Sequence, residues 1–313
     1  MTAQPLVSVI VLNYKRLHEL ERCLDSIVIQ DYPNIETIVV DNHSEEDVAS
    51  VVRARGRAMR LIELAANLGP CGGRNAGIRE ARGEVVVTID NDVSFASAFE
   101  VKHVVEAFGS HPGIHVLAFR ICDAGTGKLR LREWCHPRDW EQAAETEFET
   151  NFFGEGASAF RREVFETVGL YWEPLFIGHE GYDLGLRILN HGYRILYCPS
   201  VSVCHSMSQE TRSQSRPFYF YTRNYIWIAY KDHTFRAGVR YLAPKLLMMA
   251  FFSLRAWNPR PFLRGVWEGI SGLRRIDPRT PVARATILYL AELERYRPTW
   301  WQRYARHRLE PQL

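Results

Sequence analysis

The stretch Val85–Asp92 (VVVTIDND) constrains the fold more than any other part of the chain. Residues 85–89 are mostly aliphatic and β-branched, as in a strand covered on both faces of a parallel sheet. The strand must end at Asp90, because ionised carboxylates have to be solvated, paired or bound to a cation. In open α/β sheets, ligands bind at the carboxyl ends of the strands. Asp90 and Asp92 therefore predict a site for Mg²⁺ or Mn²⁺ with substrate phosphates, and the plainer alternative is a polar turn.

The elements around this strand predict a doubly wound α/β fold. Hydrophobic runs and helical spacing give strand 6–12, helix 17–30, strand 35–40, helix 45–55 and strand 59–64. This alternation is typical of a parallel sheet with helices on both faces. A glycine-rich stretch, 67–77 (NLGPCGGRNAG), comes next and leads into a helix predicted over 74–82. It matches neither the dinucleotide-binding pattern nor the P-loop, which argues against both of those functions.

Residues 97–205 continue the alternation of helices and strands and include a helix with two acidic residues. The pattern continues with helix 97–109, strand 114–122, helix 161–168, a helix from residue 180, and strands 193–197 and 201–204. On that helix Glu180, Asp183 and Arg187 share one face. They form either a reactive acidic group or a solvated face with an Asp183–Arg187 pair. The last strand ends on His205.

The charge distribution divides the 313 residues into an acidic domain, 1–205, and a basic C-terminal region, 206–313. The first carries 20 Lys and Arg against 29 Asp and Glu, and the second 19 against 7. The second part is rich in aromatic residues, among them Trp300 and Trp301. It is expected to form a helical appendage that lies on a membrane surface, forms an oligomer interface or packs on the acidic domain. Nucleic-acid binding is disfavoured, because no such module is present.

The composition favours a cytoplasmic protein. The six cysteines include no Cys-x-x-Cys pair and are expected to be reduced thiols. No N-terminal leader is evident. The longest apolar block, 241–254, is shorter than the roughly 20 residues of a membrane span. The expected location is therefore the cytoplasm, with contact at the inner membrane face as an option.

Six motifs in order resemble glycosyltransferase family 2, which has the GT-A fold, and in particular its rhamnosyltransferase-like branch. They are VSVIVLNYKR, IVVDNHS, NLGPCGGRNAG, VVVTIDND, HEGYDLGLRILNHGYRILYCPSVSVCH and FLRGVWEGISGLRR. The resemblance implies a metal-dependent, inverting enzyme that uses Mn²⁺ or Mg²⁺. Such an enzyme moves a sugar from a UDP- or dTDP-sugar to a hydroxyl of a glycan, a lipid-linked molecule or a small natural product.

The resemblance also implies roles for individual residues. Asp41 would read the uracil or thymine base, while Asn13 and Arg16 would border the nucleotide. Arg74 and Asn75 would approach the base and diphosphate. Asp90 would face the ribose and donor sugar, with Asn91 beside it. Asp92 and His205, with Asp90 nearby, would hold the metal.

The motif for the general base departs from the family pattern. Where relatives have Glu-Asp-x-Asp, this chain has Glu180, Gly181, Tyr182 and Asp183. Glu180, or otherwise Asp183, is expected to take the proton of the acceptor hydroxyl. Two alternatives are a sugar nucleotidyltransferase, disfavoured because no glycine-rich loop follows the first strand, and a nucleotide-sugar-binding protein without transfer activity, favoured by Gly181.

Overall fold

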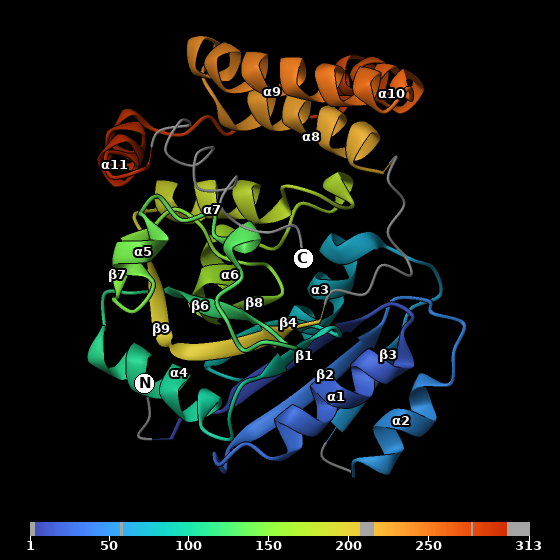
Figure 1. Cartoon of the computed structure of the whole chain (residues 1–313), viewed down its shortest axis with the longest axis vertical. Helices are drawn as coiled ribbons and strands as arrows, with labels where there is room; N and C mark the ends of the chain where they lie inside the picture. The colour runs from blue at the N-terminus through green and yellow to red at the C-terminus, as the bar shows by residue number, and fades with distance from the viewer. Residues whose placement is uncertain (1–3, 57–58, 207–215, 277, 299–313) are drawn as a thin grey trace.

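The computed structural model describes residues 4–56, 59–206, 216–276 and 278–298 (Figure 1). Within these ranges the strands form one nine-stranded sheet with the order β3-β2-β1-β4-β8-β6-β9-β5, and β7 pairs with β9. The strands are β1 (Val7–Asn13), β2 (Ile35–Asp41), β3 (Met59–Glu63), β4 (Val85–Asp90), β5 (Val93–Phe95), β6 (Val116–Asp123), β7 (Phe148–Thr150), β8 (Ala157–Arg161) and β9 (Ile195–His205). The helices are α1 (Leu17–Val28), α2 (Val48–Ala54), α3 (Gly69–Glu80), α4 (Glu100–Ser110), α5 (Trp140–Ala143), α6 (Glu163–Val168), α7 (Glu180–Asn190), α8 (Arg216–Asp232), α9 (Phe235–Arg255), α10 (Pro259–Gly272) and α11 (Arg284–Glu294).

The sheet is parallel in its first half and mixed in its second. Strands β3, β2, β1 and β4 pair in parallel, as the alternation of strands and helices predicts. Strand β8 then runs antiparallel between β4 and β6, and both β5 and β7 run antiparallel to β9. The expectation of a mostly parallel sheet therefore holds only for the first half. Because β8 is antiparallel, its first residues lie at the carboxyl end of β4.

The helices form layers on both faces of the sheet (Figure 1). Helices α1, α2 and α4 pack on one face, and α3, α6 and α7 on the other, each side closing its own hydrophobic core. Helices α8, α9 and α10 form an outer layer above α7 in this view, with α11 to one side. The carboxyl ends of the parallel strands are left open between α3 and the start of α8.

Helix α3 begins at Gly69, five residues before the predicted start at 74. A Cβ atom on Gly73 would collide with the side chain of Leu12, and one on Gly77 with that of Ile10. These glycines therefore let the helix approach β1 closely, and most of the glycine-rich stretch is the helix itself. Only Gly69 needs its own freedom, with a φ of +69° where the chain turns against the Phe176 carbonyl.

Strand β9 is continuous, where the sequence predicts two separate strands. Its pairing with β6 shifts register between Phe119 and Arg120, whose partners are Cys198 and Ser202, and this irregularity accommodates Pro199. The short strand β5, which the sequence does not predict, pairs with the end of β9 so that Val93 lies opposite His205. Residues more than a hundred positions apart are thereby joined at one edge of the sheet.

Helix α8 is bonded to the segment that precedes α7. Arg223 donates to the carbonyls of Pro174 and Leu175 at 3.0 and 2.8 Å. Asn224 donates to the carbonyls of Leu175, Ile177 and Gly178 at 2.8–3.0 Å. Ile228 is fully buried in the same core as α7. Packing of the basic region on the catalytic domain is thus present for α8, whereas Trp300 and Trp301 lie outside the described residues.

Helix α9 extends the apolar block that the sequence indicates. At 21 residues it is the one helix, within the described ranges, that is long and apolar enough to cross a membrane by length and composition. The expectation that the block is too short therefore applies to residues 241–254 and not to the whole helix. Only 17% of its most apolar window is buried.

Candidate active site

A cavity of about 660 Å³ lies at the carboxyl ends of β1 and β4. It has a polar floor and a rim of aromatic side chains from the segment before α7 and from α8. The lining residues are Leu12, Tyr14, Arg16, Asn42, Asn67, Gly69, Pro70, Asp90, Asn91, Asp92, Glu133, Glu155, Phe176, Ile177, His205, Pro217, Phe220 and Tyr221. Five of the predicted site residues are in this set: Arg16, Asp90, Asn91, Asp92 and His205.

Asp92 and His205 lie side by side on the cavity floor. The Nε2 atom of His205 is 3.5 Å from Oδ2 of Asp92. The backbone fixes this approach, because Ser206 donates its N–H to the Asp92 carbonyl at 2.8 Å. On the other side of the ring, Nδ1 lies 2.7 Å from Oε1 of Glu133. A carboxylate on Nδ1 leaves Nε2 free to act as a metal ligand.

Arg16, in the loop after β1, contacts the Asp92–His205 pair through Asp92. Its guanidinium donates to Oδ2 of Asp92 at 2.7 Å and to Oδ1 of Asn91 at 3.1 Å. Both Lys15 and Arg16 have left-handed backbone conformations, with φ of 62° and 63°. Such conformations are costly for residues with a side chain and cluster at functional sites. The strained turn directs Arg16 back over the end of β4.

The charges of this group shift one another's ionisation. Burial alone would raise the pKa of Asp92, but the hydrogen bond and charge of His205, together with Arg16, lower it to about 2. Burial would lower the pKa of His205, but Asp92 and Glu133 raise it to about 9. The imidazole is therefore cationic at neutral pH in the absence of a competing cation. A metal at Nε2 would displace that proton.

The donor set fits a metal that also binds phosphate oxygens. Among the residues that the structure describes, no group of three or more His, Cys, Asp or Glu side chains is placed to hold a metal. The Asp92–His205 pair would supply two ligands to a metal and leave further positions for a diphosphate. Asp90 does not join them, because its Oδ1 accepts from Nη2 of Arg74 at 2.6 Å. The predicted third ligand is instead part of an ion pair.

Arg74 connects Asp90 to helix α7. Its side chain is buried, and Nη1 lies 3.6 Å from Oε1 of Glu180. Oε2 of Glu180 is buried without a hydrogen-bond partner. Glu180 lies behind the cavity wall rather than in it. Burial raises its pKa to about 7, Glu155 adds to the rise, and Arg74 opposes it.

This raised pKa predicts how a Glu180→Gln variant depends on pH. The carboxyl of Glu180 releases its proton near pH 4.5 in the unfolded chain and near pH 7 in the folded one. Glu180 therefore lowers the free energy of unfolding as pH rises between these two values, and the loss is complete above pH 7. We expect Glu180→Gln to gain stability over the wild type as pH rises from 5 to 8, by on the order of 1–3 kcal/mol. Melting temperatures at four pH values measure this. The exposed Glu166→Gln serves as control, and a difference that is constant with pH would contradict the prediction.

Asp183 is enclosed in the protein, which argues against its predicted role as the alternative general base. It is fully buried, with Oδ2 bonded to Arg187 at 2.8 Å and Oδ1 to Lys231 at 2.6 Å. Burial would raise its pKa, but the two cations hold it below its usual value. The helix spacing predicts Arg187 as the partner of Asp183, and the structure has this ion pair, but the Asp183 carboxylate is buried and not exposed to solvent. A carboxylate so paired and enclosed cannot reach an acceptor.

Three residues predicted to contact the nucleotide bond to the protein itself. Asn13 is fully buried, and its amide donates to Asp41 at 2.9 Å and accepts from Asn91 at 2.8 Å. Asp41 also accepts two hydrogen bonds from Ser44. Neither Asn13 nor Asp41 lines the cavity; together they join the ends of β1 and β2.

Asn75 is also directed away from the cavity. Its amide donates to the Tyr171 carbonyl at 2.8 Å and to Glu173 at 2.9 Å, and it accepts from the Tyr171 N–H at 3.0 Å. The expected contact with the base and diphosphate is therefore replaced by an anchor between α3 and the segment before α7. Arg74, at the preceding position, is connected to the site through its ion pair with Asp90.

Two carboxylates of the cavity are absent from the sequence prediction. Glu133 lies in an irregular segment (RLREW) with no pattern that distinguishes it. Glu155 is different, because it stands between two glycines in FFGEGAS, directly before a strand. A charged residue held between glycines at the start of a strand is a usable signal in the sequence.

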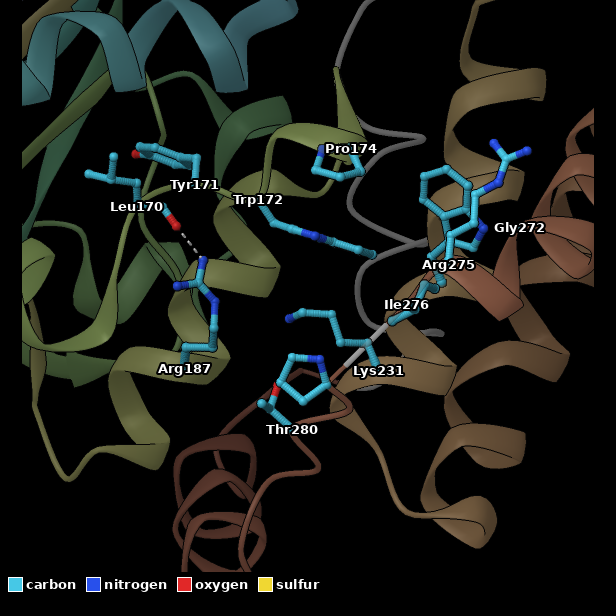
Figure 2. Close-up of a pocket in the computed structure, with 12 residues that line it drawn as sticks. Leu170, Tyr171, Trp172, Pro174, Arg187, Lys231, Gly272, Arg275, Ile276 and Thr280 are labelled. Carbon is cyan, nitrogen blue, oxygen red and sulfur yellow. Dashed lines mark hydrogen bonds between the residues drawn. The ribbon is translucent and has the colours of Figure 1, made fainter.

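A second cavity, of about 540 Å³, lies between the sheet-and-helix body and the C-terminal helices (Figure 2). Arg187 extends into it from α7 and donates to the Leu170 carbonyl at 2.8 Å, and Lys231 reaches toward α7 from α8. No carboxylate belongs to its lining among the described residues. Of these two cavities, the first is therefore the one with carboxylates in its lining.

Known proteins are similar to this chain in sequence. A model of Glycosyl transferase family 2 matches residues 8–169. Among curated proteins, the uncharacterized glycosyltransferase YwdF of Bacillus subtilis is 24% identical over 212 residues, which cover 67% of this chain and 77% of that protein. The GalNAc(5)-diNAcBac-PP-undecaprenol β-1,3-glucosyltransferase of Campylobacter jejuni is 37% identical over 92 residues, 28% of this chain and 30% of that protein.

Solved structures agree on the fold. Mannosyltransferase PcManGT from Pyrobaculum calidifontis, in complex with GDP-Man and Mn²⁺, has a TM-score of 0.56 at 22% identity over 93% of this chain and 80% of that one. TarS 1-349 from S. aureus, in complex with UDP-GlcNAc, has a TM-score of 0.60 at 16% identity over 93% and 89%. These similarities confirm the predicted fold class. The chain belongs to glycosyl transferase family 2 and is a glycosyltransferase with the GT-A fold.

Proposed function

We propose that this glycosyltransferase is metal-dependent and inverting, and that its donor is a UDP- or dTDP-sugar. The observation that carries the proposal is the Asp92–His205 pair on the cavity floor, with Glu133 holding the opposite side of the imidazole. This is the set of ligands that a metal shared with a diphosphate requires. Mn²⁺ is the first candidate and Mg²⁺ the second, since the complex of PcManGT contains Mn²⁺.

The chain's own residues account for binding and leaving-group departure. When bound, the metal supplies Lewis-acid stabilisation of the charge that develops on the diphosphate. Arg16 and Asp92 hold one side of that position, and the Asp90–Arg74 pair sets the floor beside the sugar. The aromatic rim from Phe176, Phe220 and Tyr221 narrows the cavity and limits access of water. A single base and a direct displacement invert the anomeric centre.

A thermal-shift panel tests this function. UDP-, dTDP- and GDP-sugars are each added with Mn²⁺, with Mg²⁺ and with EDTA. A ligand at a hundred times its Kd stabilises the folded state by about 2.7 kcal/mol, so one nucleotide class should raise the melting temperature only when a metal is present. Nucleoside diphosphate release then reports transfer. Binding without any release would favour a nucleotide-sugar-binding protein, as Gly181 would allow, and pyrophosphate release from a nucleoside triphosphate would favour a nucleotidyltransferase.

The finer assignments belong to the same proposal. The rhamnosyltransferase-like branch suggests a deoxyhexose donor, and the acceptor is a hydroxyl of a glycan, a lipid-linked molecule or a small natural product. A lipid-linked acceptor is supported by the partial similarity to the undecaprenol-linked glucosyltransferase. The division into a catalytic domain, 1–205, and a helical region, 206–313, remains a prediction.

We further propose that α9 and α10 contact the inner face of an anionic membrane, which would place the enzyme in the cytoplasm beside such an acceptor. Both helices expose large apolar side chains; Trp267 on α10 is 73% exposed, and Trp257 in the turn between the two helices is 94% exposed. The region around them is strongly basic. Exposed aromatic residues with surrounding arginines are typical of interfacial helices.

Vesicle sedimentation tests this contact. The protein should sediment with phosphatidylglycerol vesicles, bind less in high salt, and bind phosphatidylcholine weakly. Trp257→Ser combined with Trp267→Ser should reduce binding, while Trp140→Ser on the catalytic domain should not. Absence of binding together with a concentration-dependent dimer in light scattering would assign the face to a homo-oligomer instead.

A further inference from the structure

Glu155 is a carboxylate of the donor cavity with no assigned role. It lies in the short loop that enters β8, and antiparallel pairing places that loop at the carboxyl end of β4, beside Asp90. Its backbone is fixed there, because Thr88 donates its hydroxyl to the Glu155 carbonyl at 2.8 Å. Gly156 lies so close to the Asp90 carboxyl that a Cβ atom would collide with it. The loop therefore holds Glu155 firmly at the cavity.

Gly181 leaves the space that the Glu155 side chain occupies. A Cβ atom on residue 181 would collide with Oε1 of Glu155 and lie 2.6–2.7 Å from Cδ and Cγ. The backbone of Gly181 is ordinary helix, so its conformation does not require glycine. The side chain of Glu155, which fills the adjacent space, explains why residue 181 has no side chain. A carboxylate from β8 stands where a side chain from α7 would otherwise project.

The start of α7 binds the carboxylate of Glu155. The Gly181 N–H donates to Oε1 of Glu155 at 2.8 Å, and the first turn of this helix receives no hydrogen bond from its own N-cap side chain. A carboxylate at a helix N-terminus is stabilised by the helix dipole and by the free N–H groups. Glu180, one residue earlier, is enclosed behind it, and its pKa is raised to about 7 in part by the charge of Glu155. Of the two, Glu155 lines the cavity and Glu180 does not.

We propose that Glu155 is the general base of the transfer reaction, in place of Glu180. This assignment rests on the proposed function. The acceptor O–H proton passes to the carboxylate of Glu155 as the acceptor oxygen bonds to the anomeric carbon. The bond from that carbon to the diphosphate oxygen breaks, and its electron pair leaves with the nucleoside diphosphate. Glu180 acts as a positioning residue that holds Arg74 against Asp90.

A Glu155→Gln variant separates this role from a purely structural one. The amide oxygen can still accept the Gly181 N–H, so the variant should keep its melting temperature and its donor KM. It cannot accept a proton, and kcat should fall about 10²–10⁴-fold. The probe is the UDP-, dTDP- or GDP-sugar that stabilises the wild type most with Mn²⁺, with nucleoside diphosphate release as the readout and water as the acceptor where no other is known. Glu166→Gln on the exposed side of α6 is the matched control.

A relocated carboxylate provides the second arm. Glu155→Gly removes the base, and adding Gly181→Asp places a carboxylate in the vacated space from the first turn of α7. The double variant should release nucleoside diphosphate at least tenfold faster than Glu155→Gly. This comparison decides the question if Glu155→Gln is poorly folded. A Glu155→Gln enzyme within threefold of the wild-type rate, or a double variant no better than Glu155→Gly, would overturn the assignment and leave the transferase intact. A wild type that binds donors but releases no diphosphate overturns both.

Discussion

Replacing Asp92 with asparagine should reduce transfer at least about a thousandfold. The oxygen that remains can still accept from Arg16, so the loop after β1 keeps its place. The lost negative charge removes one of the two proposed metal ligands and the charged partner of His205, which lies 3.5 Å away. Metal stabilisation of the leaving group contributes several kcal/mol, and about 4 kcal/mol corresponds to a thousandfold in rate. Steady-state release of nucleoside diphosphate at saturating donor measures the effect.

The accompanying measurements identify the cause of that loss. Donor stabilisation by Mn²⁺ in thermal shift should disappear in Asp92→Asn, and excess Mn²⁺ should restore little activity. Asp123→Asn is the matched control, because Asp123 is paired with Arg130 outside the cavity lining. An Asp92→Asn enzyme with undiminished turnover would contradict the metal role of this residue. Equal losses in the two variants would indicate a general effect of acidic substitution at this edge.

Replacing Lys231 with methionine should cost about 3–5 kcal/mol of stability. Its ammonium lies 2.6 Å from Asp183 and 2.7 Å from Asp232, both of which are buried. Removing one member of a buried ion pair leaves an uncompensated charge, which is the expensive case. Asp183 retains Arg187, but Asp232 has a pKa already raised to about 7 by burial and by Asp183. Denaturant unfolding at pH 7.5 measures the loss.

The pH dependence of this defect follows from the same geometry. Without Lys231 the pKa of Asp232 rises further, so the folded variant takes up a proton as pH falls. The destabilisation should therefore be smaller at pH 5.5 than at pH 7.5. Lys102→Met is the control, since Lys102 is half exposed and only 4.0 Å from Glu106 in a surface pair. A loss below about 1 kcal/mol for Lys231→Met would show that the cluster is not held by its cation.

The first half of the fold could be predicted because its signals are local. Each of β1, β2 and β4 is a run of apolar residues that ends on a polar side chain at the same sheet edge. The second half depends on pairings between distant segments. Nothing in residues 93–95 alone shows that they pair with the end of β9, and the reversal of β8 follows from packing between β4 and β6.

The candidate site divides in the same way. Asp92 and His205 follow from the motifs and lie together. Asn13 and Asn75 are polar residues beside a site in sequence, but their amides bond to neighbouring protein groups that only the fold identifies. Glu155 was missed because its importance depends on an absent side chain at residue 181, twenty-six positions away. A missing group is informative only when the structure shows what fills its space.

The bonds from Arg223 and Asn224 to the carbonyls of residues 174–178 have a consequence for protein engineering. Those carbonyls belong to the segment that supplies Phe176 and Ile177 to the cavity wall, and α8 adds Phe220 and Tyr221. A truncated catalytic fragment ending near residue 205 would expose the carbonyls and lose half of the rim. The sheet domain therefore cannot be exchanged as a separate module at that boundary, and a chimera must carry α8 along with the sheet.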